Sequence, residues 1–180
     1  MQSLSLLHWH VLYVKHQHEK KVEQLLQEKN IEVFLPLIKS IKVWSDRKKQ
    51  IWTPLFPRYI FVHALSRKEF YHALSTEGVI KYLKFGNEYA VIRATEIFHI
   101  KALLNIENIS EIKVENNLPS KGQKMRISYG PLNGLDCEVI KVNNKRKIIV
   151  RIESIRHYIT AYLPSMYLSP QKFTKSSANI

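Results

Sequence analysis

The chain has 180 residues, enough for one mid-sized domain or two small ones. Hydrophobic residues make up 45% of it and aromatic residues 11%, which is typical of a folded protein and excludes general disorder. Lys and Arg outnumber Asp and Glu by 28 to 15; this excess favours a polyanionic partner such as DNA, RNA or a nucleoprotein assembly, although a basic surface without such a partner is the open alternative.

The first 107 residues interleave strand and helix patterns. Alternating apolar residues rich in β-formers mark the strands, and apolar residues three and four apart mark the helices. Ser66 followed by Glu69 forms a capping-box pattern at the start of the second helix. The expected strands are 9–15, 31–37, 38–44, 51–53, 79–85 and 88–92, and residues 54–62 are expected to form a turn that leads into a further strand. The expected helices are 18–29, 66–75 and 94–105. This order predicts an α+β domain over residues 6–107, with its helices packed on one face of a sheet.

The rest of the chain has a different pattern. Residues 108–120 contain asparagines and a Pro-Ser pair without clear periodicity, so we expect a linker there. Residues 121–170 contain short strand patterns at 124–128, 137–142, 147–152 and 159–163, separated by tight turns. Closely spaced short strands of this kind predict a small β-barrel. Residues 171–180 are polar and are expected to form a flexible tail.

Three blocks of the sequence, in order, resemble the NusG family of transcription factors. The first is Trp9-x-Val11-x-Tyr13-x-Lys15 followed by Glu19-Lys-Lys-Val22, which resembles the opening of the family's N-terminal (NGN) domain. The second is Val33-Phe-Leu-Pro36, leading to Trp44-Ser-Asp-Arg-Lys-Lys49 and Pro54-Leu-Phe-Pro-Arg-Tyr-Ile-Phe-Val62. The third is Gly122-Gln-Lys-Met-Arg-Ile127 with Gly130-Pro-Leu-Asn-Gly134, similar to the KOW motif of the C-terminal barrel. The second block is most similar to specialised paralogues of the RfaH and UpxY type, and UpxY-type proteins act on capsular polysaccharide operons.

The resemblance implies an NGN-type mixed sheet flanked by helices, a flexible linker and a small KOW-type β-barrel. It also implies a cytoplasmic, monomeric factor for transcription elongation and antitermination. Such a factor binds the clamp helices of the RNA polymerase β′ subunit and promotes pause-resistant elongation, here of specific, polysaccharide-type operons. Two alternatives stay open. One is a general housekeeping factor of the same family, and the other is a KOW-type ribosome- or RNA-binding protein without affinity for polymerase.

The strand that follows Pro54 supplies the expected polymerase-binding surface. Alternation places Tyr59 and Phe61 on one face of this strand and Ile60 on the other. Because helices need to cover only one face of the sheet, the other face can display aromatic side chains. The resemblance implies that the polymerase-binding residues are Tyr13, Pro54, Phe56, Tyr59 and Phe61. The alternative is that they are core residues, above all Phe61. Relatives also contact the gate loop of the polymerase β subunit through a threonine-rich segment. The corresponding residues 69–72 do not match that segment, so this second contact stays an open alternative.

Basic residues provide the expected nucleic-acid contacts. The hairpin-tip residues Arg47, Lys48 and Lys49 are expected to approach DNA near the upstream fork, although a solvated turn is the alternative. By position in the family, Lys15 and His16 lie where specialised relatives contact the displaced non-template DNA strand. In the C-terminal domain the expected partner-binding residues are Lys141, Lys145, Arg146 and Lys147. In relatives this domain recruits a small-subunit ribosomal protein or Rho.

Nothing in the sequence predicts catalysis, a cofactor or a metal site. It lacks a P-loop, a nucleophile elbow, an HExxH motif and paired carboxylates, so we do not expect an enzyme. His8, His10, His16 and His18 have no cysteine or carboxylate cluster at ligand spacing, and we expect them on the surface or at an interface. The single cysteine, Cys137, fits a reducing compartment. No apolar run reaches the roughly 18 residues that a membrane span needs, so no membrane partner is expected.

Overall fold

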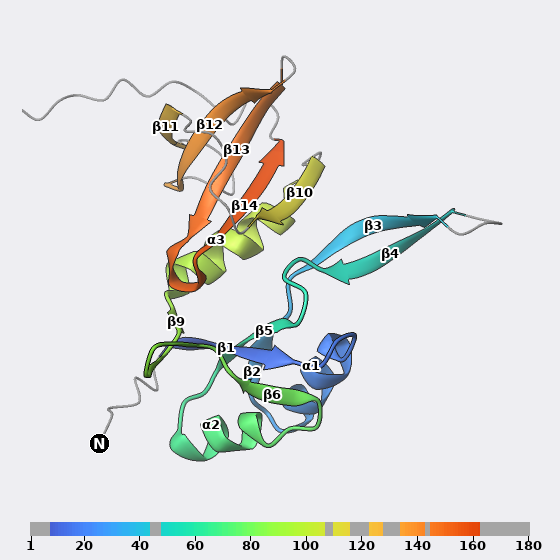
Figure 1. Ribbon diagram of the computed structural model, residues 1–180, viewed down its shortest axis with the longest axis vertical. Helices are drawn as coiled ribbons and strands as arrows, with labels where there is room; N and C mark the ends of the chain where they lie inside the picture. The colour runs from blue at the N-terminus through green and yellow to red at the C-terminus, as the bar shows by residue number, and fades with distance from the viewer. Residues whose placement is uncertain are drawn as a thin grey trace, which may run out of the picture.

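The computed structural model describes residues 8–43, 48–106, 110–115, 123–127, 134–142 and 145–162. Figure 1 shows one sheet in each half of the chain, with helix α3 between them and a two-stranded ribbon projecting to one side. The elements of the N-terminal half are β1 (Trp9–Val14), α1 (Glu19–Glu28), β2 (Glu32–Phe34), β3 (Leu37–Val43), β4 (Lys48–Pro54), β5 (Tyr59–His63), α2 (Arg67–Leu74), β6 (Val79–Tyr82), β7 (Lys84–Phe85), β8 (Glu88–Tyr89), β9 (Val91–Ile92) and α3 (Ala94–Leu104). The predicted α+β class is confirmed for this half.

The N-terminal sheet has the strand order β2-β5-β1-β6, and β9 also pairs with β1. All of these pairs are antiparallel. In the central pair, Val11 lies opposite Phe61 and Leu12 lies opposite Ile60. Because successive side chains of a strand point to opposite faces, these two pairs belong to different faces of the sheet.

One face of this sheet is covered by helices α1 and α2. Leu12 and Ile60 belong to a buried cluster with Val22 and Leu26 of α1 and Phe70 of α2. Val22 and Leu26 are four residues apart, so they lie on the same side of α1, and both are fully buried. Burial of these apolar side chains, each worth about 1.5–3 kcal/mol, holds the two helices on the sheet.

The N-terminus of α2 has the predicted serine cap, and the glutamate of the predicted capping box bonds a backbone N–H one residue earlier than expected. Ser66 Oγ accepts a hydrogen bond from the backbone N–H of Glu69 at 3.1 Å. The Glu69 carboxylate accepts from the N–H of Leu65 at 2.8 Å, one residue before the expected donor. Two backbone donors that the helix itself cannot satisfy are thereby paired.

The opposite face of the N-terminal sheet packs against α3 and the C-terminal sheet. Val11 and Phe61 belong to one buried cluster with Ile100 of α3 and Ile148 and Val150 of the C-terminal sheet. The prediction that the helices share one face is therefore wrong for α3. Apolar residues surround much of this helix, and a helix of that kind is buried on more than one side.

The C-terminal half forms a five-stranded antiparallel sheet in the order β10-β14-β13-β12-β11. Its elements are β10 (Ser110–Glu115), β11 (Gln123–Arg126), β12 (Asp136–Val142), β13 (Lys145–Ile152), the short 3₁₀ helix η2 (Glu153–Ile155) and β14 (His157–Tyr162). Closure of this sheet into a KOW-type barrel stays a prediction. The structure differs from the sequence interpretation in the expected linker, where residues 110–115 form β10 and Val114 pairs with Ile159. Apolar and polar residues alternate over only six positions in this segment, which is too short to predict a strand before its pairing with β14 is known.

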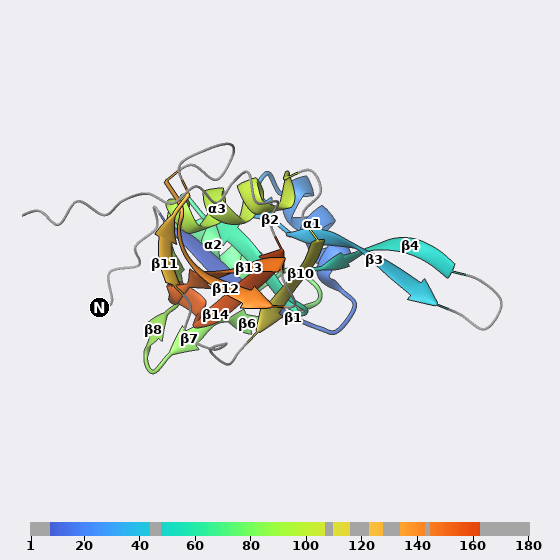
Figure 2. The same ribbon diagram turned by 90° about the horizontal axis from the view of Figure 1, so that it is seen from above.

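Strands β3 and β4 form the predicted hairpin. They pair from Leu37 with Pro54 to Val43 with Lys48, so the second strand begins earlier than the sequence pattern indicated. Figures 1 and 2 both show this ribbon extending away from the two sheets. Its tip, residues 44–47, lies outside the described residues. None of the helices described here has the length and apolar character needed to cross a bilayer.

Candidate functional site

The predicted polymerase-binding aromatics come together on the sheet face opposite α1 and α2. A tight turn precedes β5, in which the N–H of Tyr59 donates to the carbonyl of Phe56 at 3.1 Å. The rings of Phe56 and Phe61 meet edge to face at 5.5 Å between centroids. Tyr13 and Tyr59 lie opposite each other on β1 and β5, with centroids 5.6 Å apart. Edge-to-face and tilted arrangements of this kind are favourable for aromatic rings. The structure thus unites four of the five predicted residues, and Pro54 ends the neighbouring strand β4.

Arg58 and Glu19 position this cluster, and the sequence interpretation assigned a role to neither. Arg58 has a φ of 68°, in the left-handed region that is costly for a residue with a side chain. Its N–H donates to Glu19 Oε1 at 2.8 Å. Its guanidinium carbon lies 4.4 Å from the centroid of the Tyr13 ring. Glu19 is only 6% exposed, and its carboxylate caps this turn.

The C-terminal sheet covers the aromatic cluster. The ring of His157, at the start of β14, lies 6.1 Å from Phe56 and 5.7 Å from Tyr59 between centroids, edge to face with both. Phe56 is 1% exposed and Phe61 is fully buried. The expectation that these two rings are displayed on a free surface is therefore not met in this arrangement. Burial, and then the neighbouring Tyr13, raise the pKa of the Tyr59 hydroxyl.

A groove remains open along the junction of the two halves. Its volume is about 470 Å³. Ile38, Leu55 and Tyr59 line it from the N-terminal half, and Ile112, Val114 and His157 line it from the C-terminal half. The two halves therefore leave a mainly apolar space between them at the edge of the aromatic cluster.

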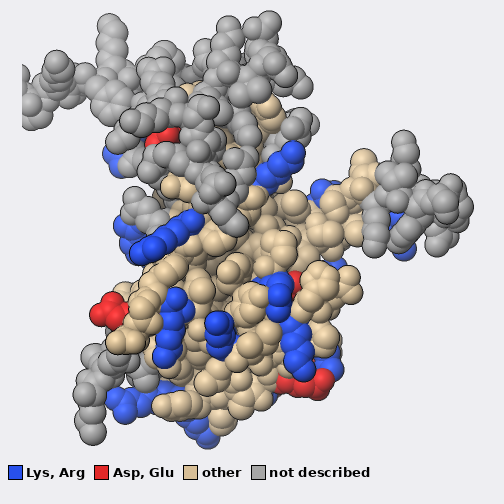
Figure 3. Space-filling view, viewed as in Figure 1, with Lys and Arg blue, Asp and Glu red and all other residues tan. Residues whose placement is uncertain are grey.

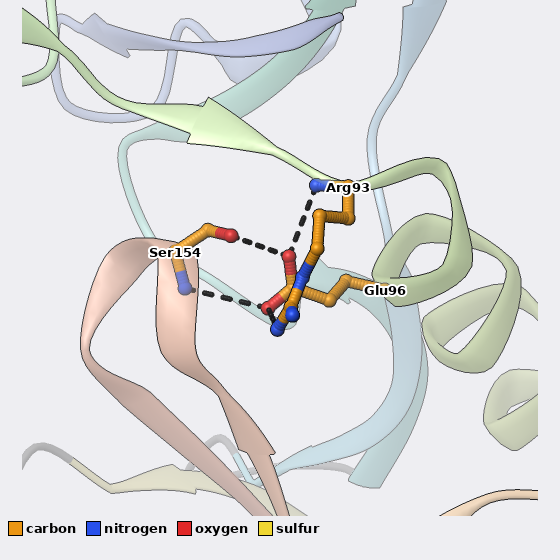
Figure 4. Close-up of polar contacts among 3 residues, drawn as sticks. All are labelled: Arg93, Glu96 and Ser154. Atoms are coloured by element: carbon orange, nitrogen blue, oxygen red, sulfur yellow. Dashed lines mark hydrogen bonds and ion pairs between the residues drawn. The ribbon is translucent and has the colours of Figure 1, made fainter.

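A buried carboxylate, that of Glu96, joins the two halves of the chain (Figure 4). Glu96, in the first turn of α3, is 5% exposed. It accepts hydrogen bonds from Ser154 of η2, through the hydroxyl and through the backbone N–H at 3.3 Å. It also accepts from the N–H of Arg93 at 3.0 Å. Burial alone would raise the pKa of Glu96, but the hydrogen bonds from Ser154 and Arg93 together lower it below the ordinary value.

The predicted nucleic-acid residues occupy two separate places. Lys15 and His16 are exposed just after β1. Lys49 is exposed on β4, the backbone of Lys48 begins that strand, and Arg47 lies outside the described residues. Figure 3 shows Lys and Arg side chains spread over this face of the molecule among uncharged residues, not gathered in one patch. Their role in binding nucleic acid stays a prediction.

The predicted partner-binding residues of the C-terminal half lie on two adjacent strands. In the pairing of β12 with β13, Lys141 lies opposite Arg146, and Lys145 and Lys147 are also in β13. Their side chains lie outside what the structure describes. The backbone register nevertheless places all four residues at one end of a hairpin.

The histidines of the N-terminal segment do not form a common site. His10 is 2% exposed, which corrects the expectation of a surface or interface residue. Its Nδ1 lies 3.1 Å from the carbonyl of Ala90, and its ring meets Phe70 and Tyr82 edge to face. Within the described part of the chain, no group of three or more His, Cys, Asp or Glu side chains is arranged to hold a metal ion.

Comparison with known proteins identifies the family. A family model described as "Transcription termination factor nusG" matches residues 7–101, which are 95 of the 180 residues. The chain is also similar to a solved structure of Thermotoga maritima NusG that concerns its domain interaction, with 21% identity over 89% of this chain and 94% of that chain and a TM-score of 0.52. This likeness shows a shared fold.

Two further solved structures match with less similarity. They are two conformations of the MjSpt4:Spt5 complex, with 19% and 20% identity over 88% and 91% of this chain and 94% and 99% of that chain. Their TM-scores of 0.33 and 0.32 do not indicate a common overall arrangement. The family model, however, covers more than half of the chain. The chain therefore belongs to the NusG family of transcription factors.

Proposed function

We propose that this protein is a transcription elongation factor that binds RNA polymerase through the aromatic face of its N-terminal sheet. The observation that carries this proposal is the cluster of Tyr13, Phe56, Tyr59 and Phe61 on the face that α1 and α2 leave uncovered. Aromatic side chains contribute much of the binding energy of protein interfaces, and an apolar groove beside them suits a helical partner. The family resemblance implies that this partner is the pair of clamp helices of the β′ subunit.

Binding at this face requires the C-terminal sheet to move away from it. His157 occupies the space in front of Phe56 and Tyr59. A partner that docks on these rings therefore competes with the chain's own C-terminal half. The apparent dissociation constant for polymerase is then the intrinsic constant divided by the fraction of molecules in which the face is open. Loosening the contact between the two halves should strengthen polymerase binding.

A pull-down of core RNA polymerase tests the docking face. Tyr59→Ala and Tyr13→Ala suit the test because both side chains are partly exposed, whereas Phe56→Ala would cost about 3–5 kcal/mol of stability. Tyr71→Ala is the matched control, because Tyr71 is 60% exposed on α2, on the other face of the sheet. We expect wild type and Tyr71→Ala to bind and the two other variants to bind at least about tenfold more weakly.

Two results would argue against the proposal. If Tyr59→Ala and Tyr13→Ala bind polymerase as wild type does, the docking face lies elsewhere. If no form of the protein binds polymerase while all bind RNA, the alternative of a KOW-type RNA-binding protein takes its place. Circular dichroism of each variant shows whether a loss of binding reflects a loss of fold.

We further propose a specialised factor that promotes pause-resistant elongation and antitermination of polysaccharide-type operons. The support is the similarity of residues 44–49 and 54–62 to RfaH- and UpxY-type relatives. Deleting the gene should lower the RNA from distal genes of such an operon relative to proximal genes and leave other long operons unchanged. A uniform effect on most long operons would instead indicate the general housekeeping factor.

The remaining partners are proposed from sequence position. Lys15 and His16 are expected to contact non-template DNA, and the basic hairpin of β12 and β13 is expected to bind a small-subunit ribosomal protein or Rho. Substituting Lys141, Lys145, Arg146 and Lys147 by Gln should weaken capture of that partner without changing capture of polymerase. Equal capture by the substituted and wild-type proteins would exclude this hairpin as the binding site.

A further inference from the structure

The groove at the junction of the two halves has the size and composition of a small-molecule site. Its volume is about 470 Å³. Sites for small molecules have volumes of about 300–1,000 Å³, are largely apolar with a few polar groups, and often lie where domains meet. Six of the nine lining residues that the structure describes are apolar: Ile38, Leu55, Phe56 and Pro57 from the N-terminal half and Ile112 and Val114 from the C-terminal half.

The other described lining residues, Tyr59, Lys113 and His157, supply the polar groups. Burial, and then the neighbouring Tyr13, raise the pKa of the Tyr59 hydroxyl, so this hydroxyl stays protonated and can donate a hydrogen bond. Lys113 is exposed on β10, and its ammonium group only donates. His157 Nδ1 donates to the carbonyl of Ile155, which fixes the ring as part of the wall. No acidic side chain is among the described lining residues, so the groove is complementary to an anion.

The groove is complete only while the two halves are in contact. Ile112 and Val114 belong to β10, and β10 pairs with β14 of the C-terminal sheet. Docking of a partner on the aromatic face requires this sheet to move away, and the β10 wall then leaves with it. A helical partner can therefore use only the N-terminal wall. An occupant that contacts both walls must fit between them, and a space of this volume fits a small molecule.

We propose that the groove binds a small apolar carboxylate, with its hydrocarbon chain against Leu55 of one half and Val114 of the other, and with its carboxylate at Lys113 and the Tyr59 hydroxyl. Burial of the chain supplies affinity, and charge-assisted hydrogen bonds select an anion. Such a ligand binds only the closed arrangement, so it stabilises the contact between the halves and competes with polymerase. The competition rests on the proposed function, but the binding of the ligand does not.

Isothermal titration calorimetry of the full chain tests the groove without polymerase. The ligands are hexanoate, octanoate and decanoate, each below the concentration at which it forms micelles. Every added methylene that becomes buried should raise the association constant about fourfold. Octanamide has the same chain length as octanoate but no charge, and it should bind at least about tenfold more weakly.

Two conservative variants remove the polar groups one at a time. Tyr59→Phe should weaken octanoate binding about tenfold, as expected for a lost hydrogen bond from a partly buried hydroxyl to a charged group. Lys113→Gln should weaken it about threefold, because Lys113 is exposed and surface ion pairs contribute less. Tyr71→Phe and Lys68→Gln are the matched controls, because they change exposed residues of α2 on the other face of the N-terminal sheet. Both should bind octanoate as wild type does.

Amide hydrogen exchange shows whether the ligand holds the two halves together. The backbone N–H of Ser154 donates to Glu96 across the junction, so it is protected while the halves are in contact. At an octanoate concentration of about ten times its dissociation constant, the protection factor at residue 154 should rise about tenfold. The N–H of Leu83 donates to the carbonyl of Val11 within the N-terminal half, and its protection should not change.

The proposal is overturned if none of the three carboxylates binds, if octanoate and octanamide bind equally, or if affinity does not rise from hexanoate to decanoate. Octanoate binding that is equal in wild type, Tyr59→Phe and Lys113→Gln, or that leaves protection at residue 154 unchanged, would place the ligand outside the groove and would also overturn it. Sedimentation velocity tests another occupant, because a dimer that octanoate dissociates would assign the groove to a second copy of the chain. Octanoate binding and protection as expected, together with a failure to capture polymerase, would count against the proposed function alone.

Discussion

Replacing Ser154 by Ala should loosen the contact between the C-terminal half and the aromatic face. The substitution removes the hydroxyl that donates to the buried carboxylate of Glu96 and leaves the backbone donor of residue 154 in place. A hydrogen bond to a charged group contributes about 1.5–3 kcal/mol. Because Arg93 and the backbone N–H of residue 154 still satisfy Glu96, the lower part of that range applies here, about 1.5–2 kcal/mol. The equilibrium for opening should therefore rise about 10- to 30-fold.

Amide hydrogen exchange measures this opening even when the open form is rare. The amide of residue 154 is protected by Glu96 only while the two halves are in contact, so its protection factor should fall by the same factor of about 10 to 30. The amide of Leu83, bonded to Val11 within the N-terminal sheet at 2.8 Å, should not change. Ser75→Ala is the matched control, because Ser75 is an exposed serine at the C-cap of α2 whose hydroxyl donates to the backbone carbonyl of His72. An unchanged protection factor at residue 154 in Ser154→Ala would refute the view that this carboxylate holds the halves together.

Three further predictions concern pH, the backbone conformation of one glycine and a helix cap. The pKa of Glu96 in the folded protein is lowered, so its contribution to the contact is complete above the ordinary value of 4.5 and is lost as the pH falls through the folded pKa. In that pH range, the protection factor at residue 154, corrected for intrinsic exchange, should drop in wild type and much less in Glu96→Gln. Gly78→Ala should lower the free energy of unfolding by about 3 kcal/mol in urea titrations, because the φ of Gly78 is +91° and an added Cβ would lie 2.9 Å from Val22 Cγ2. A loss under about 0.5 kcal/mol would contradict this prediction. Ser66→Ala should cost about 1 kcal/mol through loss of the α2 cap, and an unchanged urea midpoint would show that the cap contributes nothing.

Local patterns in the sequence were sufficient for most helices and strands of the N-terminal half. Strand β1 and helix α1 follow directly from the alternation at Trp9–Val14 and from the spacing of Val22 and Leu26. The alternation in β5 also separates Phe61 from Ile60 correctly. Strand alternation and helix spacing depend on backbone geometry over a few consecutive residues, so a short stretch of sequence is enough to predict them.

The sequence interpretation failed where one segment depends on a distant one. Residues 110–115 alternate too briefly to predict a strand, and they become β10 by pairing with β14, more than forty residues later in the chain. Helix α3 was recognised, but its position between the two sheets was not, because an apolar surface on several sides does not indicate which surfaces it meets.

The sequence by itself determined which aromatic residues share a face of the sheet, because side-chain direction alternates along every strand. Only the tertiary structure decided what covers that face. Glu19 reaches Arg58 across 39 positions, Ser154 reaches Glu96 across 58, and His157 lies against Phe56 and Tyr59 from the other half of the chain. Contacts between residues so far apart leave no periodicity in the sequence, because they depend on the packing of whole elements and not on the conformation of a single one.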